Sequence, residues 1–209
     1  VAERVMENLR RQLDCCVVDL YRIVGPEYFT PPYLPPAMFR RFVLPLELGR
    51  DTAAALRAAI PPGIECEVFA HGRLPLAYSA RCFTARHLEL AKDDCGFRCI
   101  DYPDGIALAT QEGQPFLAIN GIQTQSAATH NLLPVLQELL DDGIDLLRVS
   151  PQSRGTGEVV HTFRACLDGE LEPARGRERL ARHAPAGFCD GYWTGSPGIA
   201  RLPIRASGA

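Results

Sequence analysis

The run IECEVF, residues 64–69, decides the fold, because this short apolar stretch predicts a β-strand that ends by Gly72. Helical patterns and further strand-like runs alternate on both sides of it. The predicted strands are 42–44, 64–69, 115–124 and 144–150, and the predicted helices are 52–60, 131–143 and 157–168. This alternation is typical of parallel βα units, in which helices cover both faces of the sheet. The sequence therefore predicts an α/β fold of parallel βα units, with the strand at 115–124 running into a polar loop.

The start of the chain differs in character from the remainder. Prolines gather toward the end of the first 37 residues and block regular structure there. Residues 1–37 are therefore predicted to be an irregular arm with a proline-rich linker, and residues 38–209 to be the βα domain. That domain offers about four strands, too few to close an eight-stranded barrel, which usually takes about 250 residues.

The composition excludes several classes of protein. The chain has 209 residues, 46% of them hydrophobic and 22% charged, as in an ordinary globular protein. Its 22 basic and 25 acidic residues give a net charge of -3, which argues against the broad basic surface of a nucleic-acid-binding protein. No apolar run is long enough to cross a bilayer, and the first residues lack the pattern of an export signal. We therefore expect a cytoplasmic protein.

The eight cysteines are the most informative residues. In a reducing compartment they are expected to be metal ligands or buried thiols rather than disulfides. Cys82, Cys95 and Cys99 lie in the segment 78–105 with the spacing C-x12-C-x3-C, and only the second gap resembles that of a zinc site. Irregular spacing is more typical of an iron–sulfur cluster, which takes four cysteines. The alternative is that all three are small buried apolar residues.

Two glutamates are candidates for catalysis. Glu65 and Glu67 share one face of the predicted strand, because side chains alternate along a strand. A buried carboxylate must find a partner or take part in chemistry. In the other interpretation, one glutamate lies at a solvated strand end and the other pairs with an arginine. Glu47, which follows the first strand, is a second weak catalytic candidate, beside Glu67.

Further polar residues follow the predicted strands, where α/β proteins place functional groups. They are Asn120, Gln123, Ser150 and Gln152. Each is expected to be an ordinary loop residue unless several of them converge on one pocket. The five histidines show no metal-ligand spacing, and the chain has no nucleophile elbow, phosphate-binding loop or dinucleotide fingerprint. Conventional hydrolase and nucleotide chemistry therefore lacks its motifs.

The run ECEVFAHGRLPLAYSARCF, with the pattern E-x-F-x-x-G at Glu67, Phe69 and Gly72, resembles the signature of the collagenase-like peptidase family. The runs RCFTAR, KDDC, YPDG, LAINGIQT, RVSPQ and CDGYW extend this likeness from about Phe42 to Trp193. Together they resemble the cluster-binding branch of that family, which acts in oxygen-independent ubiquinone biosynthesis. Residues 1–37 do not share the resemblance.

The resemblance implies a TIM-like barrel in which Cys82, Cys95 and Cys99 are three ligands of a [4Fe-4S] cluster. The family's fourth ligand lies far upstream, in the N-terminal half of the barrel, whereas only 81 residues precede Cys82 here. We therefore expect an incomplete barrel, the C-terminal half, from a truncated or frame-shifted product, or else a substitute ligand such as Cys15 or Cys16. Arg81, Arg86 and Arg98 are expected either to surround the cluster or to be solvated.

The resemblance also implies partners and a reaction. The expected partners are a homologous subunit, with which the chain would form a heterodimer, and a lipid-binding accessory protein. The expected role is that of an iron–sulfur subunit in anaerobic hydroxylation of the quinone ring. Two alternatives stay open, namely a peptidase that uses Glu67 with His71, and a non-catalytic fragment that serves as a scaffold or is inert.

Overall fold

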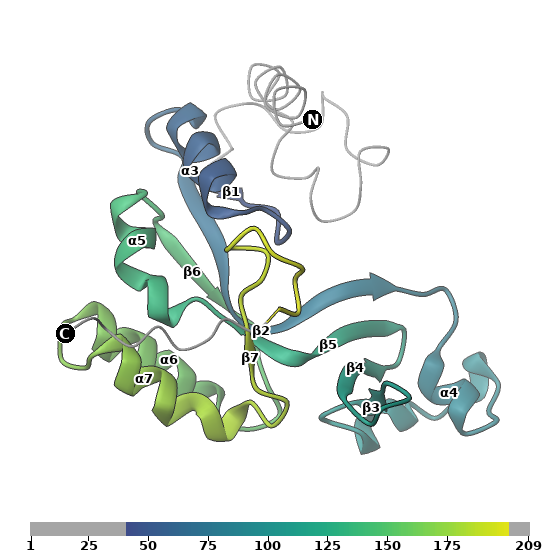
Figure 1. Ribbon diagram of the computed structural model, residues 1–209. Coiled ribbons are helices and arrows are strands. Elements are labelled where there is room, and N and C mark those ends of the chain that lie inside the picture. The colour runs from purple at the N-terminus through teal and green to yellow at the C-terminus, as the bar shows by residue number, and fades with distance from the viewer. Residues whose placement is uncertain (1–40, 201–209) are drawn as a thin grey trace. The chain divides into compact units, whose positions relative to one another are not determined.

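The structure is a computed structural model that describes residues 41–200 (Figure 1). The predicted arm and linker at 1–37, together with Cys15 and Cys16, lie outside the described residues. The strands are β1 (Arg41–Val43), β2 (Glu65–Tyr78), β3 (Ile106–Ala109), β4 (Pro115–Asn120), β5 (Gln123–Asn131), β6 (Leu146–Val149) and β7 (Phe188–Cys189). They form one sheet in the order β1-β2-β5-β4-β3, with β6 paired to β2 and β7 paired to β5.

Helices and 3₁₀ turns lie between the strands along the chain. They are α3 (Arg50–Ala59), α4 (Phe83–His87), α5 (Leu136–Asp141), α6 (Thr156–Leu167) and α7 (Pro173–Leu180), with 3₁₀ turns η2 (Lys92–Asp94), η3 (Arg98–Asp101), η4 (Leu133–Val135) and η5 (Ala181–His183). Helix α3 ends as predicted, because Ile60 precedes a proline and takes an extended conformation, with ψ 129°. Between residues 41 and 200, none of these helices has the length and apolarity needed to cross a membrane.

The described chain divides into two compact units. The first contains residues 41–69, 135–148 and 192–198, and within it β1 runs parallel to the start of β2, with Phe42 opposite Cys66. The buried face of α3, formed by Ala53 and Leu56, joins an apolar core with Leu136 and Leu139 of α5. Arg50 at the start of α3 pairs with Asp142 at 2.9 Å, which ties the two helices at their ends.

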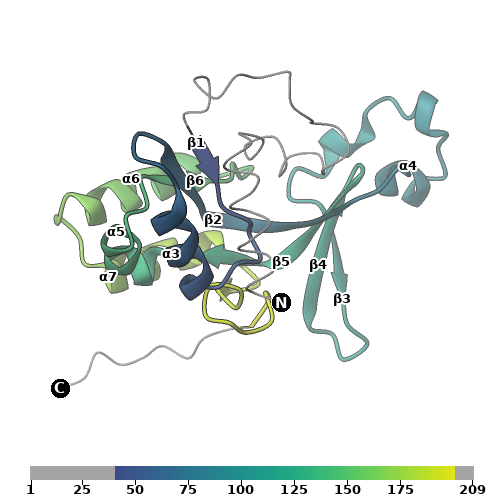
Figure 2. The ribbon, with the colours of Figure 1, turned by 90° about the horizontal axis from the view of Figure 1, so that it is seen from above.

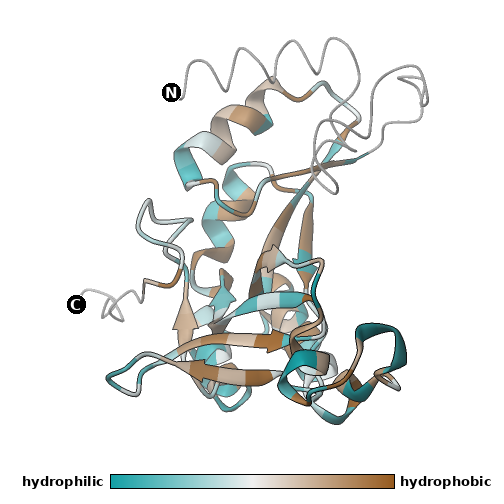
Figure 3. Cartoon of the chain, turned by 90° about the vertical axis from the view of Figure 1, so that its right-hand side faces the viewer, coloured by the Kyte–Doolittle hydropathy of each residue, from teal (hydrophilic) through white to brown (hydrophobic). Residues whose placement is uncertain are grey.

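The second unit contains residues 70–134, 149–191 and 199–200. Its strands β5, β4 and β3 form an antiparallel meander on the second half of β2 (Figure 2). Helices α6 and α7 lie side by side, and Gly176 of α7 allows this close approach, because a Cβ there would lie 3.0 Å from Cys166 Sγ and 3.2 Å from Thr162 Cγ2 of α6. Strands β3 and β4 of the meander are largely apolar (Figure 3), with Leu108 and Phe116 exposed, whereas β5 is mostly polar.

The α/β class is confirmed, whereas the prediction of an all-parallel sheet is wrong. The β1–β2 and β5–β7 pairs are parallel, but the pairs β2–β5, β4–β5 and β3–β4 are antiparallel. The segment 115–124 is not a strand followed by a loop. It is a hairpin in which Asn120 pairs with Gln123, and Gly121, with φ 57°, takes the first position of the two-residue turn.

The other predicted elements differ in length rather than in kind. The strand predicted at 64–69 continues to Tyr78 through a bulge near Pro75. The helix predicted at 157–168 is α6, shifted by one residue. The helix predicted at 131–143 begins only after the end of β5, because Asn131 is the last residue of that strand. Helix α7, which starts with Pro173, was not predicted.

Candidate functional site

The cysteine-bearing segment folds into short turns at the end of the meander. Cys82 caps α4, and its Sγ accepts a hydrogen bond from the Ala85 amide at 3.4 Å. Cys95 ends η2, and Cys99 lies within η3. All three thiols are half-buried. The interpretation of these cysteines as buried apolar residues is therefore wrong; that description fits Cys66 and Cys189, which are fully buried.

Asn120 braces this segment from the end of β4. Its Nδ2 donates to the Cys99 carbonyl at 3.1 Å and to the Tyr102 carbonyl at 2.7 Å. Its Oδ1 accepts from Thr84 Oγ1 at 3.2 Å, and Thr84 Oγ1 in turn accepts from the Gly121 amide. One amide side chain thus joins α4, which follows Cys82, to η3, which carries Cys99. Asn120 was predicted as a polar residue at a strand end, and its role here is structural.

The link between Cys95 and Cys99 has an unusual backbone. Gly96 and Phe97 both take left-handed conformations, with φ 56° and 54°. This conformation is uncommon for a phenylalanine and costs free energy, so the surrounding turns must hold it. The side chains of Phe97 and Ile100 are about three-quarters exposed, at 75% and 76%. The segment therefore presents its cysteines together with unburied apolar groups.

The three arginines near the cysteines are exposed, which agrees with their interpretation as solvated residues. Arg98 pairs with Asp101 at 3.0 Å on the same turn. Lys92, from the same segment, donates to the Ala80 carbonyl at 2.6 Å. These contacts stabilise the loop without neutralising its positive charge at Arg81 and Arg86.

The donor set of the segment has the chemistry of an iron–sulfur site. Soft thiolate ligands select such clusters, and the sulfur at Cys82 already accepts an amide hydrogen bond of the kind that tunes them. Within residues 41–200, no three cysteine, histidine or acidic side chains converge closely enough to hold a metal ion. The six described cysteines are all free thiols, as expected for this composition. The three cysteines therefore have the ligand type that an iron–sulfur cluster needs. To bind one cluster together, their side chains would have to move closer to one another.

Glu67 is bound by arginines. It is 7% exposed, and its carboxylate lies 3.1 Å from Arg41 Nη1 and 3.4 Å from Arg148 Nε. Arg148 also lies over the ring of Phe69, at 5.3 Å from the centroid. Glu65, on the same face, is half exposed at the strand end. The structure thus confirms the interpretation in which one glutamate is solvated and the other pairs with an arginine.

Glu67 and His71, the pair considered for a peptidase, form no hydrogen bond with each other. His71 is fully buried in the second unit, and neither ring nitrogen has a hydrogen-bond partner among the described residues. Its ring packs edge-on against Phe163 and Phe188, at 5.9 and 6.3 Å. Burial, with smaller contributions from His130 and His183, lowers the pKa of His71 to about 4. Glu47, the other weak catalytic candidate, lies exposed in the turn after β1.

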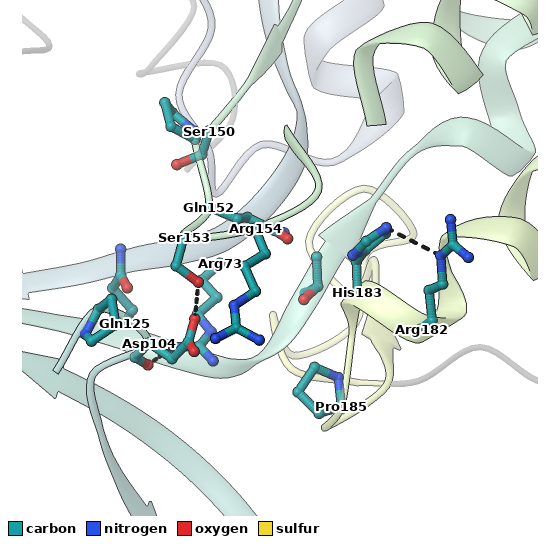
Figure 4. A pocket seen from close by; sticks show the side chains of 13 residues that line it. Arg73, Asp104, Gln125, Ser150, Gln152, Ser153, Arg154, Arg182, His183 and Pro185 are labelled. Atoms are coloured by element: carbon teal, nitrogen blue, oxygen red, sulfur yellow. Dashed lines mark hydrogen bonds between the residues drawn. The ribbon is translucent and has the colours of Figure 1, made fainter. Parts of the chain in front are cut away.

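A polar pocket of about 320 Å³ lies within the second unit (Figure 4). Ser150 and Gln152 line it, as their positions after a strand suggested, whereas Asn120 and Gln123 do not. Its charged wall was not predicted, because its members are far apart in the chain: Arg73, Asp104, Arg154, Arg182 and His183. The runs YPDG and RVSPQ contribute several lining residues, but in the sequence they indicate only the family resemblance and not a pocket.

The fold and these thiols define an α/β protein with a cysteine-bearing turn segment beside an antiparallel hairpin. Comparison with known proteins narrows this class. The model of peptidase family U32 matches residues 34–202, so the chain belongs to peptidase family U32. The resemblance to the collagenase-like peptidase family is thereby confirmed at the level of the family.

One curated relative is named "Collagenase" and comes from Porphyromonas gingivalis. It is 25% identical over 173 residues, which cover 73% of this chain and 42% of the relative. The chain therefore matches less than half of that protein's length. No solved structure matches the chain.

Proposed function

We propose that this chain is the iron–sulfur subunit of a cytoplasmic complex that hydroxylates the ubiquinone ring without dioxygen, of the UbiV type within the family. Cys82, Cys95 and Cys99 would provide three ligands of a [4Fe-4S] cluster. A UbiU-like homologue would complete a heterodimer, and a lipid-binding accessory protein would present the substrate. Residues 38–209 would then be the C-terminal half of a TIM-like barrel, into which the antiparallel meander is inserted.

The brace formed by Asn120 is the observation that carries this proposal. A loop of exposed turns that only connected two strands would need no half-buried amide joining its two ends. Here three hydrogen bonds fix the Cys99 carbonyl and the start of α4 to the same side chain. Such fixation favours cluster binding, because ligands held in advance lose less conformational entropy when they bind.

When bound, the cluster would supply electron transfer. The chain's own residues would hold it and set its surroundings. The Ala85 amide would donate to a ligating sulfur, and the arginines at 81 and 86 would offset the negative charge of the thiolates, whereas Arg98 is paired with Asp101. The fourth ligand is not among the three cysteines of the segment; Cys15 and Cys16, the candidate substitutes, lie outside the described residues.

Metal analysis of single cysteine variants tests the proposal. The chain is purified under nitrogen together with its homologous partner, and iron and acid-labile sulfide are measured for Cys82→Ser, Cys95→Ser and Cys99→Ser. We expect near-equal iron and sulfide in the wild type and a loss of most of both in each variant. Cys166→Ser is the matched control, because Cys166 is a half-exposed thiol on α6, outside the segment.

Equal iron in all four variants and the wild type would reject the proposal. So would colourless wild-type protein that is folded and complete with its partner. Circular dichroism of every variant separates loss of the cluster from loss of the fold.

Peptide cleavage is the second candidate function, supported by the name of the relative from Porphyromonas gingivalis. It needs a nucleophile or an activated water. The carboxylate of Glu67, the acid of the Glu67–His71 pair, is engaged by two arginines. Cleavage of gelatin that is lost in Glu67→Gln but kept in Cys95→Ala would favour the peptidase over the cluster protein.

A further inference from the structure

The pocket of the second unit is separate from the cysteine segment. None of the three cysteines lines it, and its walls come from β2, the YPDG turn, β5, the loop before α6 and the residues after α7. Its volume of about 320 Å³ falls at the small end of the range for ligand pockets, roughly 300–1,000 Å³. The pocket therefore has room for a small molecule.

The charge of the lining is predominantly positive, in a chain whose net charge is -3. Arg73, Arg154 and Arg182 line the pocket, and Asp104 is the single acidic residue among the lining residues. Arg73 Nη1 donates to the backbone carbonyl of Asp104, and the Asp104 carboxylate accepts from Ser153 Oγ. Arg73 is thus positioned by a backbone oxygen, and its charge is not cancelled by a direct ion pair.

Among the lining residues, Arg154 is the strongest indication of an anion-binding site. Its guanidinium has no hydrogen-bond or ion-pair partner anywhere in residues 41–200, although it reaches in between Asp104 and His183 (Figure 4). Arg154 directly precedes Gly155, the N-cap of the 12-residue helix α6, and no side chain caps that helix. None of the first residues of α6 lines the pocket, but the dipole of a helix N-terminus favours a negative charge nearby, in addition to the guanidinium.

The wall of the pocket formed by Arg182 and His183 is fixed by contacts with Glu158. Glu158 of α6 pairs with Arg182, with Arg179 at 3.1 Å and with His183 Nε2 at 2.7 Å. These hydrogen bonds lower the pKa of Glu158 to about 2, so the carboxylate stays charged near neutral pH. Gly155 makes room for the His183 ring, because a Cβ at position 155 would lie 2.3 Å from His183 Cε1.

We propose that this pocket binds a small organic anion through a carboxylate or phosphate group, with Arg154 as its principal ligand. A guanidinium offers paired N–H donors that match either oxyanion. Arg73 adds positive charge beside it, whereas Arg182 is already paired with Glu158, and Ser150 and Gln152 supply neutral hydrogen-bonding groups. This inference does not depend on the cluster, because it uses no residue of the cysteine segment.

Calorimetric titration tests the proposal on the full chain in low-salt buffer, with inorganic phosphate, malonate and benzoate as separate probes. We expect at least one probe to bind, and Arg154→Gln to weaken that binding about tenfold or more, the loss expected for one charge-assisted hydrogen bond. The melting temperature should not change, because Arg154 has no hydrogen-bond or ion-pair partner among residues 41–200 that the substitution would remove. The probe that binds identifies the phosphate or the carboxylate class.

The matched control is Arg175→Gln. Arg175 is an exposed arginine of α7 that likewise has no partner in the described chain, and it lies outside the pocket. Its variant should bind the probe like the wild type. Equal weakening in both variants would show that only the net charge of the protein matters, and would overturn the proposal. If none of the three probes binds at about 20 mM, a concentration that should fill a specific site, the proposal is also overturned. Iron content should be unchanged in Arg154→Gln, so failure here leaves the cluster proposal standing.

Discussion

Glu65 and Glu67 lie two residues apart on the same face of β2, and their surroundings give them different roles. Glu67 is nearly buried between Arg41 and Arg148, whereas Glu65 is half exposed. A buried carboxylate must be paired, since an unpaired one would carry a large desolvation cost. The identity of a residue therefore says less about its role than the partners that the fold gives it.

At this site we predict that Glu67→Gln lowers the free energy of unfolding by about 1 kcal/mol, because two half-exposed arginines lose their common partner. The matched variant Glu65→Gln should change it by less than about 0.5 kcal/mol. Urea denaturation of both variants measures the difference. Equal effects would mean that burial of Glu67 between the arginines has no energetic role.

His71 gives the protein a predictable sensitivity to acid. Its pKa of about 4 in the fold lies below the ordinary 6.5, so the unfolded chain binds the proton more tightly. The stability from its neutral form is present above about pH 6.5 and is lost as the pH falls toward 4. This residue alone should remove about 2 kcal/mol of stability between pH 7 and pH 5.

Replacing His71 by leucine should remove that part of the pH dependence. Stability at pH 7 should stay close to that of the wild type, because the ring nitrogens make no hydrogen bond to lose. Denaturation at pH 7 and pH 5 is compared with the exposed control His161→Leu. A pH dependence in His71→Leu as steep as in the control would contradict the assignment of acid sensitivity to His71.

At the scale of elements, the β4–β5 hairpin positions the cysteine segment. The hairpin turn at Gly121 places Asn120 where its side chain reaches both α4 and η3. The Phe83 amide also donates to the Gly121 carbonyl, at 2.6 Å. The turn thus serves as an anchor for the loop that carries the thiols.

We predict that Asn120→Asp loosens this segment. The carboxylate would face two carbonyl oxygens where the amide donated to both, at a local cost of about 1–3 kcal/mol. Hydrogen exchange should accelerate in residues 95–102 and remain unchanged in α6. Gln123→Glu, the corresponding amide-to-carboxylate change at a half-buried position of the same hairpin, is the control. Unchanged exchange in Asn120→Asp would show that the brace does not hold the segment.

At the scale of the whole molecule, local signals predicted well and long-range pairing did not. Pro61 and Pro62 mark the end of α3, and the apolar period at 157–168 marks α6, because both signals act within a few residues. The antiparallel meander was missed, although a glycine at the first position of a two-residue loop, here Gly121, is a hairpin signal. Continuous apolar runs occur in parallel and antiparallel strands alike, so the run at 115–119 did not determine its partner.

Of the two candidate sites, one could be predicted from local sequence and the other could not. The cysteine segment could be found from the sequence, because its three thiols lie within eighteen residues. The arginine-lined pocket could not, since Arg73, Arg154 and Arg182 come together only through the packing of β2, α6 and α7. Ser150 and Gln152 were identified from their place after a strand, which is a local feature of α/β folds.

The cluster is the central claim, and Mössbauer spectroscopy tests it most directly. The chain is produced without oxygen on isotopically enriched iron, together with the proposed homologous partner, and its spectrum is compared with that of the Cys82→Ser, Cys95→Ser, Cys99→Ser triple variant. We predict the quadrupole doublets of sulfur-ligated tetrahedral iron in the wild type and their loss in the triple variant. A wild-type spectrum with only oxygen- or nitrogen-ligated iron, or with the same signal in both proteins, would contradict the account.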